Sequence, residues 1–289
     1  MGVLLEGKWV KRSLIRSDNK GSYDRLPRTF RETISLDHPV YKPESLRYHL
    51  YVSYACPWAT RTLIYRELKD LVKHISISVV HPDLLDDGWT FNDSFPLATK
   101  DHLYSFKLLR DVYIKADPKV TTSVTVPVLF DKITKTIVNN ESSEIIRIFN
   151  SSFNSLTQNT LDFYPQDKKQ EIDKLNRKIY ENINNGVYKA GFAKNQASYE
   201  NAVNLLFKEL DSLDDIQTAN VRLATRRQAD EDDQQPMRIA QEPAEEGEGV
   251  FIPMLAEGSA SARAPYTARA ATSGRSSSCL RTSKAWSPP

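Results

Sequence analysis

The chain is poor in cysteine, with only Cys56 and Cys279 among its 289 residues. Two thiols make no disulfide framework of the kind that staples small secreted proteins, so the composition predicts a reducing compartment, with the cytoplasm as the default. The five histidines have no spacing typical of metal ligands. No metal site is therefore expected.

Long apolar runs and a strong net charge are missing as well. No run approaches the roughly 18–20 apolar residues that cross a bilayer, and the N-terminus lacks the apolar stretch of a signal peptide. The net charge of +2 is too small to indicate nucleic acid or an anionic membrane as a partner. A hydrophobic content of 40% is sufficient for a core.

Cys56 lies where a strand-like segment meets a helix-like one. Residues 48–54 alternate as a strand does, with Tyr48, Leu50, Val52 and Tyr54 on one side. A helix is expected from Pro57, with Leu63, Ile64, Leu68 and Leu71 on one face. A second alternating strand follows at 75–79. Strand, helix and strand in this order predict a βαβ unit with parallel strands.

The position of Cys56 indicates a reactive thiol. Unpaired N–H groups and the positive end of the helix dipole favour a thiolate there, and Pro57 suits the first helical position. Ala59 stands where a dithiol site has its second cysteine, so an external thiol such as glutathione must complete any redox cycle. Arg61 either adds positive potential or is a surface charge. The alternative interpretation of Cys56 is a buried core cysteine.

A second strand pair and a helix follow along the chain. Residues 124–131 form a strand-like segment that contains Pro127, a turn leads to a strand at 136–138, and Asn140 is a suitable N-cap for the next helix. The order βαβ-ββα predicts an α/β thioredoxin-like domain. In such folds the Val126-Pro127 bond is cis and faces the cysteine; the alternative is an ordinary edge-strand proline.

Glu141 and Ser142 are expected at the N-terminus of that helix. The free N–H groups and Ser142 can hold a carboxylate, and Glu141 can pair with an ammonium group. The γ-glutamyl end of glutathione presents both groups on one carbon. The alternative is a capping sequence without a ligand.

Composition divides the chain into four parts. Residues 1–27 are polar and basic and predict a flexible leader, and 28–155 contain the thioredoxin-like domain. Residues 162–216 have helical periodicity and predict a partial, all-α C-terminal domain. From 217 to 289 periodicity is lost and large apolar residues are sparse, which predicts disorder.

Seven segments in the same order resemble the glutathionyl-hydroquinone reductases, the Xi class of glutathione transferases, which are close to the omega-like transferases of fungi. The resemblance covers about residues 28–216. The matched segments are Phe30–Ile34, Ala55–Ala59, Gly88–Phe91, Ala116–Pro118, Thr125–Leu129, Asn139–Arg147 and Ile183–Ala193.

The resemblance implies glutathione as co-substrate, small aromatic glutathione conjugates as substrates, and an assembly that can include a homodimer. Cys56 would attack the sulfur of a glutathionyl-hydroquinone and release hydroquinone, and a second glutathione would resolve the Cys56–glutathione disulfide. Tyr188 would face the aromatic substrate. The residues that would hold glutathione are Trp89, Arg110, Val126, Pro127, Glu141 and Ser142.

Some features depart from the family pattern. Thr60 replaces the usual histidine, and residues after Gln217 do not continue the family's helices, so an incomplete helical domain with exposed apolar surface and poor stability is expected. The sequence beyond Gln217 resembles the translation product of a shifted reading frame or of an unspliced transcript. Two alternative functions therefore remain: an omega-like dehydroascorbate reductase or thioltransferase, and an inactive transferase-like binding module.

Overall fold

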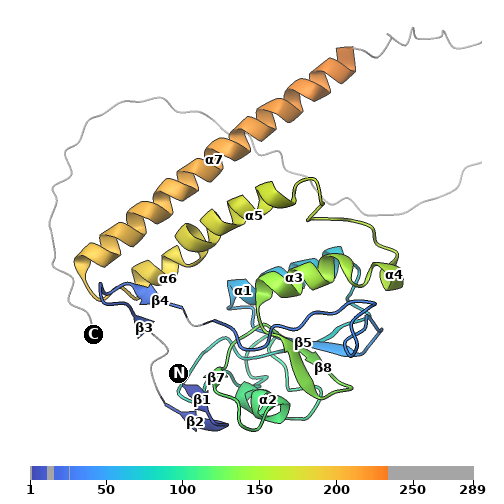
Figure 1. The fold of residues 1–289 in the computed structure, drawn as a ribbon, viewed down its shortest axis with the longest axis vertical. Helices are drawn as coiled ribbons and strands as arrows, with labels where there is room; N and C mark the ends of the chain where they lie inside the picture. The colour runs from blue at the N-terminus through green and yellow to red at the C-terminus, as the bar shows by residue number, and fades with distance from the viewer. Residues whose placement is uncertain (1, 12–15, 26, 234–289) are drawn as a thin grey trace, which may run out of the picture. The chain divides into compact units, whose positions relative to one another are not determined.

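The computed structural model describes residues 2–11, 16–25 and 27–233 (Figure 1). Its centre is a four-stranded sheet in the order β6 (Ser76–Val79), β5 (Tyr48–Val52), β8 (Val128–Asp131) and β9 (Thr136–Asn139). Strands β5 and β6 are parallel, as predicted, and the other two pairs are antiparallel. This topology confirms the thioredoxin-like α/β domain.

Helices cover both faces of this sheet. Helices α1 (Pro57–Leu68) and α3 (Ser142–Ser151) lie side by side on one face, and α2 (Leu109–Ala116) lies on the other (Figure 1). All five residues of β5 are consequently buried. The predicted strand is confirmed over Tyr48–Val52, whereas Tyr54 lies beyond it. Both faces of the strand are buried, since a strand between two helical layers has no solvent face.

The buried face of α1 also differs from the predicted one. Ala59, Thr62 and Arg66 are its buried residues, whereas Ile64 and Leu68 are exposed. Helix α1 packs closely against α3, and small side chains such as Ala59 permit that approach. The predicted face is therefore confirmed only in part, since Leu71 is buried in the core and Leu63 packs against it, whereas Ile64 and Leu68 are exposed.

The N-terminal segment is folded, so the predicted flexible leader is wrong for the residues that the structure describes. Strands β1 (Val3–Leu5) and β2 (Lys8–Val10) form a hairpin, and β1 also pairs with β7 (Thr122–Ser123). Strands β3 (Arg16–Ser17) and β4 (Tyr23–Asp24) form a second pair. The sequence pattern missed these strands because they are only two or three residues long.

The first hairpin turns at Glu6 and Gly7, which both have positive φ angles of 48° and 73°. A two-residue hairpin loop requires this conformation, and glycine is favoured there. A Cβ atom on Gly7 would also lie only 1.9 Å from the Pro118 carbonyl oxygen. The hairpin therefore depends on glycine for both its backbone conformation and its close approach to the loop before β7.

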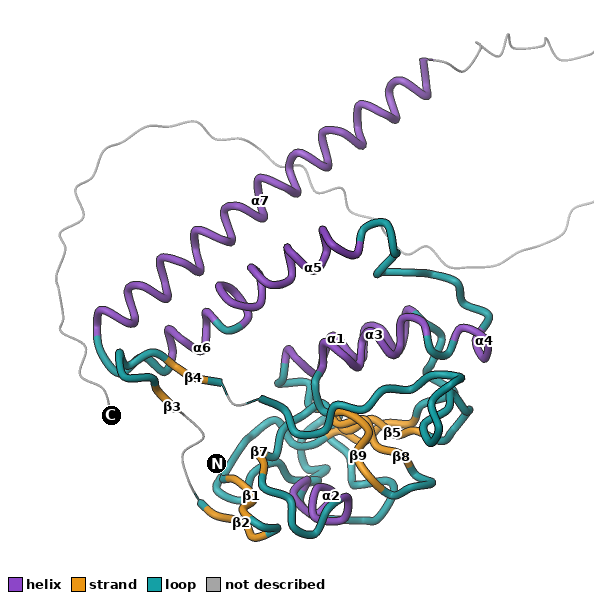
Figure 2. The backbone as a smooth tube through the Cα atoms, in the orientation of Figure 1, coloured by secondary structure: helices purple, strands orange, loops and turns teal. Residues whose placement is uncertain are grey.

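The helical segment begins after a short α4 (Asn154–Thr157) and consists of α5 (Lys169–Lys178), a π-helical turn η1 (Ile179–Asn184), α6 (Gly186–Gly191) and α7 (Gln196–Asp233). Helix α7 runs beside η1 and α6 (Figure 2). The irregular turn-forming residues around 184–186 thus mark a change from π-helical to α-helical geometry.

Helix α7 continues to Asp233, so the prediction of disorder from 217 is wrong for residues 217–233. This stretch contains several alanine, arginine and glutamine residues, which favour a helix even where an amphipathic period is missing. The rest of the predicted disordered segment, 234–289, lies outside the described residues.

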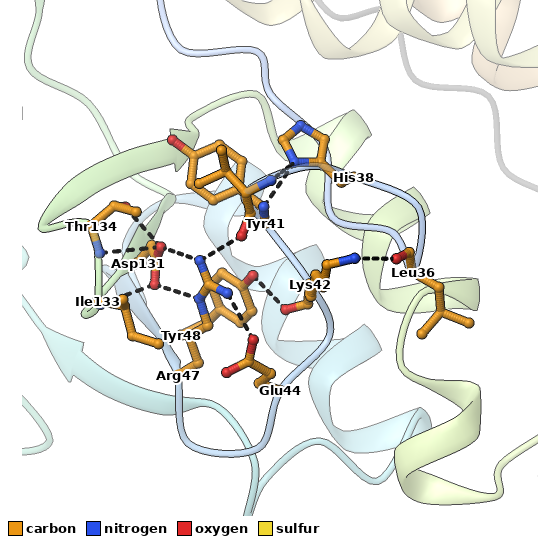
Figure 3. A network of polar contacts seen from close by, with 11 residues as sticks. Leu36, His38, Tyr41, Lys42, Glu44, Arg47, Tyr48, Asp131, Ile133 and Thr134 are labelled. Carbon is orange, nitrogen blue, oxygen red and sulfur yellow. Dashed lines mark hydrogen bonds and ion pairs between the residues drawn. The ribbon is translucent and has the colours of Figure 1, made fainter.

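A buried ion pair ties the loop before β5 to the end of β8 (Figure 3). Arg47 donates from Nε and Nη2 to the two carboxylate oxygens of Asp131 at 2.8 and 2.7 Å. Its remaining donors reach Glu44 and the Val40 carbonyl oxygen. Thr134 donates to the same carboxylate from Oγ1. Each nitrogen of the guanidinium makes at least one hydrogen bond, so the pair fixes the start of β5 against the end of β8.

Candidate active site

Cys56 is the N-cap residue of α1 and directly precedes Pro57. Its side chain is partly buried, and its Sγ donates to the Val126 carbonyl oxygen at 3.7 Å. Ala59 is completely buried at the position of a second cysteine in a dithiol site. Within the described residues Cys56 is the only free cysteine, and the geometry therefore holds a single thiol at a helix start.

Burial raises the pKa of the Cys56 thiol. The backbone N–H groups of Ala59 and Trp58 act in the opposite direction, as do the positive charges of Arg28 and Arg25, but they do not outweigh desolvation. The helix start therefore acts on the pKa of the thiol in the predicted direction, and burial acts against it and is the larger influence. The hydrogen bond that the thiol donates also requires the protonated form.

The Val126-Pro127 peptide bond is cis, as predicted. Proline lies just before β8, where it removes no donor from the sheet ladder. The contact between Cys56 and the Val126 carbonyl oxygen brings this loop against the thiol. A backbone carbonyl beside the sulfur is thus available to a peptide-like ligand.

Glu141 and Ser142 lie at the N-terminus of α3, as predicted, but Glu141 rather than Asn140 is the N-cap. The Glu141 carboxylate accepts from the backbone N–H and the hydroxyl of Ser143. Asn140 instead accepts from the Phe30 N–H and donates from Nδ2 to the hydroxyl of Tyr113, inside the domain. Its amide serves the core, which is why it does not cap the helix.

Arg61 connects α1 with this helix start. Its Nε and Nη2 donate to the Ser142 hydroxyl at 3.1 and 2.7 Å, and Nη2 lies 3.7 Å from the Glu141 carboxylate. The guanidinium also faces the Trp58 ring at 5.2 Å. Of the two interpretations of Arg61, the structure favours a charge within the site over a surface charge.

The structure does not bring Arg110 to Cys56. Arg110 donates to the backbone and side chain of Asp87, and its guanidinium faces the Trp9 ring of β2 at 4.9 Å. Trp89 is partly buried and packs against the core, with its carbonyl oxygen accepting from Leu109. Their proposed contact with glutathione stays a prediction.

Tyr188 lies on α6 and contacts Trp58, two residues after Cys56. The Trp58 indole N–H donates to the Tyr188 hydroxyl at 3.0 Å. Tyr23 stacks on Tyr188 at a ring distance of 6.0 Å, and Tyr180 lies edge-on to Trp58 at 5.9 Å. We call Tyr23, Trp58, Tyr180 and Tyr188 the aromatic cluster.

Tyr23 lies in this cluster and Arg25 beside it, and neither residue was predicted from the sequence. Arg25 faces Tyr188, and both Arg25 and Tyr23 belong to the segment that was predicted to be a leader. Trp58 could have been predicted as a site residue, because it lies in one of the matched segments. Tyr23 and Arg25 could not, since neither periodicity nor spacing distinguishes them from other residues.

Two cavities adjoin these residues. A small one is lined by Val126, Pro127, Glu141, Ser142 and Trp58, among others. A larger cleft of about 1130 Å³ lies between the helix start of α3 and the helices α5 and η1, with Arg25, Arg28, Arg61 and Arg147 among its lining residues. The cleft is richer in cationic than in anionic side chains, which suits an acidic ligand.

The described residues contain neither a cluster of metal ligands nor a membrane-spanning helix. Within residues 2–11, 16–25 and 27–233, no group of histidine, cysteine and acidic side chains could hold a metal ion. No helix in that part of the chain is long and apolar enough to cross a membrane.

A thioredoxin-like domain with one thiol at its first helix start, a cis-proline loop beside it and a following helical segment defines the glutathione-transferase class of proteins. The family model described as glutathione S-transferase, N-terminal domain, matches residues 55–152.

The chain is 47% identical to the glutathionyl-hydroquinone reductase YqjG of Escherichia coli over 223 residues, covering 75% of this chain and 68% of that protein. It is 46% identical to the omega-like glutathione S-transferase 2 of Schizosaccharomyces pombe, covering 69% and 65%. The structure resembles that of the Xi glutathione transferase ECM4 of Saccharomyces cerevisiae in complex with glutathione, with a TM-score of 0.69, 41% identity and coverage of 74% and 71%.

The chain therefore belongs to the Xi-class glutathione transferases, the family of the glutathionyl-hydroquinone reductases. It spans about two thirds of the length of the curated relatives it matches, from 65% to 73%.

Proposed function

We propose that this protein is a glutathione-dependent reductase that acts on glutathionyl-hydroquinones through Cys56. The observation that carries the proposal is the single thiol at the start of α1, in contact with the Val126 carbonyl oxygen and next to a buried Ala59. A site with one thiol passes through a mixed disulfide that an external thiol must resolve.

The residues around Cys56 fit glutathione. The Val126 carbonyl oxygen can accept from the cysteine N–H of the tripeptide, in the way that a strand edge pairs with a peptide. The Ser142 hydroxyl and the N–H groups at the start of α3 can donate to its γ-glutamyl carboxylate, and Glu141 can pair with its ammonium. Arg61 adds a cation beside that carboxylate.

In the proposed cycle, the Cys56 thiolate attacks the sulfur of the conjugate. A disulfide forms between Cys56 and glutathione, the bond between sulfur and the aromatic ring breaks, and the ring carbon takes a proton. A second glutathione then attacks the mixed disulfide, which yields oxidised glutathione and the free thiol. Tyr188 and Trp58, which a hydrogen bond joins, would supply ring surface against which the aromatic ring of the conjugate can pack.

The test is a comparison of purified protein with glutathionyl-menadiol and with dehydroascorbate. Release of menadiol is expected, and Cys56→Ser should remove it while the protein still binds a glutathione matrix. Cys279→Ser is the matched control and should keep the activity, since Cys279 has no part in the proposed cycle. Menadiol release by the Cys56→Ser variant would contradict the proposal.

Omega-like thioltransferase or dehydroascorbate reductase activity is the second candidate. It is favoured by the 46% identity to a relative named omega-like, and by a thiol whose chemistry does not depend on an aromatic substrate. Faster turnover of dehydroascorbate than of the conjugate would select it. If a cellular function survives Cys56→Ser, the inactive binding module is selected instead.

We also propose a reducing compartment such as the cytoplasm, on the ground that the site needs a free thiol and reduced glutathione. The homodimer implied by the family resemblance stays a prediction.

A further inference from the structure

Arg25 occupies a central place in the aromatic cluster. Its guanidinium carbon lies 4.3 Å from the centre of the Tyr188 ring, 5.1 Å from that of Trp58 and 5.5 Å from that of Tyr23. Three rings around one guanidinium hold it by cation–π attraction and restrict its motion. The side chain is therefore preorganised by the same rings that would receive an aromatic substrate.

A hydrogen bond fixes the orientation of the guanidinium. Its Nε donates to Asn185 Oδ1 at 2.6 Å, and Asn185 is 6% exposed. Asn185 lies between the π-helical turn η1 and α6, and such π-helical turns are frequent at functional sites. The turn-forming residues that interrupt the helical pattern thus supply the amide that orients Arg25.

One donor of this arginine has no partner. Nη2 is buried and makes no hydrogen bond with any described residue. A buried donor left unpaired costs about 1–3 kcal/mol, and more when it is charged. Arg25 lines both the small cavity beside Val126 and the larger cleft, and its charge acts on Cys56. A ligand oxygen bound in these cavities would complete its hydrogen bonds.

We propose that Arg25 is a catalytic residue that donates from Nη2 to the phenolic oxygen of the bound hydroquinone ring and stabilises the negative charge that this oxygen gains. The inference rests on the proposed function and deepens it. It names the group that stabilises the leaving hydroquinone.

The surroundings of Arg25 favour a phenolic oxygen over a carboxylate of glutathione. Tyr23, Trp58 and Tyr188 surround the guanidinium with apolar ring surface, against which a substrate ring can pack. The γ-glutamyl carboxylate has donors of its own at Ser142 and the start of α3. A phenolic oxygen therefore suits Arg25 Nη2 as an acceptor, because its ring can pack against the same aromatic side chains that surround the guanidinium.

The ring of the bound glutathionyl-hydroquinone first loses a hydroxyl proton and gains a proton on its sulfur-bearing carbon. This change converts the hydroxyl group into a carbonyl group. The Cys56 thiolate attacks the sulfur, the S–S bond forms and the S–C bond breaks. The released electron pair moves through the ring onto the oxygen, which becomes a phenolate and takes a proton from water. The two sulfurs are oxidised to a disulfide and the ring is reduced.

The experiment measures the first half-reaction in single turnover with Arg25→Met and Arg25→Lys. Hydroquinone release from glutathionyl-menadiol is expected to fall about 100-fold in Arg25→Met, the effect of removing one donor to a developing oxyanion. Arg25→Lys should recover part of the rate, because it keeps the charge but not the planar guanidinium. The mixed disulfide of glutathione and 2-mercaptoethanol has no ring oxygen. The rate at which Arg25→Met cleaves it should therefore fall much less than the rate of hydroquinone release.

Arg28→Met is the matched control, because Arg28 also lines the cleft and acts on Cys56 through its charge. It should slow both substrates by the same factor. The ratio of the rate of hydroquinone release to the rate of disulfide cleavage is the quantity compared. If this ratio is equal in Arg25→Met and Arg28→Met, the inference about Arg25 is overturned and the proposed function is not. Wild-type protein that cleaves the aliphatic disulfide but releases no hydroquinone would overturn the proposed function and, with it, the inference.

Discussion

At the scale of single residues, Cys56 combines two opposing influences. The helix start and the two nearby arginines favour its thiolate, and burial against the Val126 carbonyl oxygen favours its thiol. Burial is the larger influence, so the pKa of the thiol is raised above its ordinary value.

This balance predicts slow alkylation of Cys56 at neutral pH. Since its pKa is raised, the reaction rate with iodoacetamide should have a midpoint above the ordinary cysteine value of about 8.5. Quantitative mass spectrometry of the peptide that contains Cys56 separates it from Cys279. A midpoint below pH 7 would contradict the prediction and mean that the helix start outweighs burial.

His49 predicts a second effect at this scale, on acid stability. It is fully buried in β5, with its ring nitrogens at 2.7 Å from the Ser76 hydroxyl and 2.9 Å from that of Ser78. Burial lowers its pKa from 6.5 to about 3. In that interval the unfolded chain binds a proton that the folded chain does not, so stability is lost as pH falls from 6.5 towards 3.

The loss from His49 is at most about 5 kcal/mol, because one pKa unit corresponds to about 1.4 kcal/mol. Urea unfolding between pH 7 and 4 measures it. His49→Gln should flatten this dependence. An unchanged slope in His49→Gln would show that another group is responsible.

At the scale of elements, the pair Arg47–Asp131 predicts a large stability effect. The pKa of Asp131 is lowered: burial acts to raise it, and the hydrogen bonds from Arg47 and Thr134 outweigh burial. Asp131→Asn would leave the buried Arg47 guanidinium with only the half-exposed Glu44 carboxylate as a counter-charge. A loss of about 3–5 kcal/mol in the free energy of unfolding is expected.

Chemical denaturation measures this loss, with Asp86→Asn as the control. Asp86 forms an exposed ion pair with Lys11, which solvent screens, so its replacement should not change stability measurably. A similar small effect of both substitutions would mean that the Arg47 network in Figure 3 carries no stability.

The elements also differ in how well the sequence predicted them. The order of β5, α1, β6, β8, β9 and α3 followed from periodicity and from the residues at strand and helix ends. The hairpin of β1 and β2 did not, since three-residue strands have too few positions for a period. The prediction of the buried face of α1 was only partly right. Ala59 and Thr62 are buried because α1 packs against α3, and their hydrophobicity does not indicate this.

At the scale of the whole molecule, the helical segment leaves apolar side chains exposed. The exposed set on η1, α6 and α7 is Tyr180, Val187, Tyr199, Leu205, Phe207, Leu210 and Ile216. Contiguous apolar surface binds hydrophobic dyes and promotes association. The thioredoxin-like domain has a contiguous buried core, and Ile64 and Leu68 of α1 are among the apolar side chains that it exposes.

We therefore expect the chain to bind the dye ANS in native buffer while it keeps the near-ultraviolet circular dichroism of its buried aromatic residues. Phe207→Lys should reduce the dye fluorescence, because Phe207 is 58% exposed on α7. Leu97→Lys, at a still more exposed leucine of a loop, is the control and should leave the fluorescence unchanged. Equal fluorescence in all three proteins would indicate that this surface is covered in solution.

The sequence by itself determined the thioredoxin-like order of strands and helices, the single thiol at the start of α1 and the positions of Val126, Glu141 and Ser142. These depend on local patterns, such as alternation, proline and capping, which neighbouring residues carry. Only the tertiary structure decided that burial raises the pKa of Cys56, that Arg61 joins Ser142 and that Arg25 lies among three rings. Each of these depends on the desolvation or pairing of groups far apart in the chain, and no local pattern contains that information.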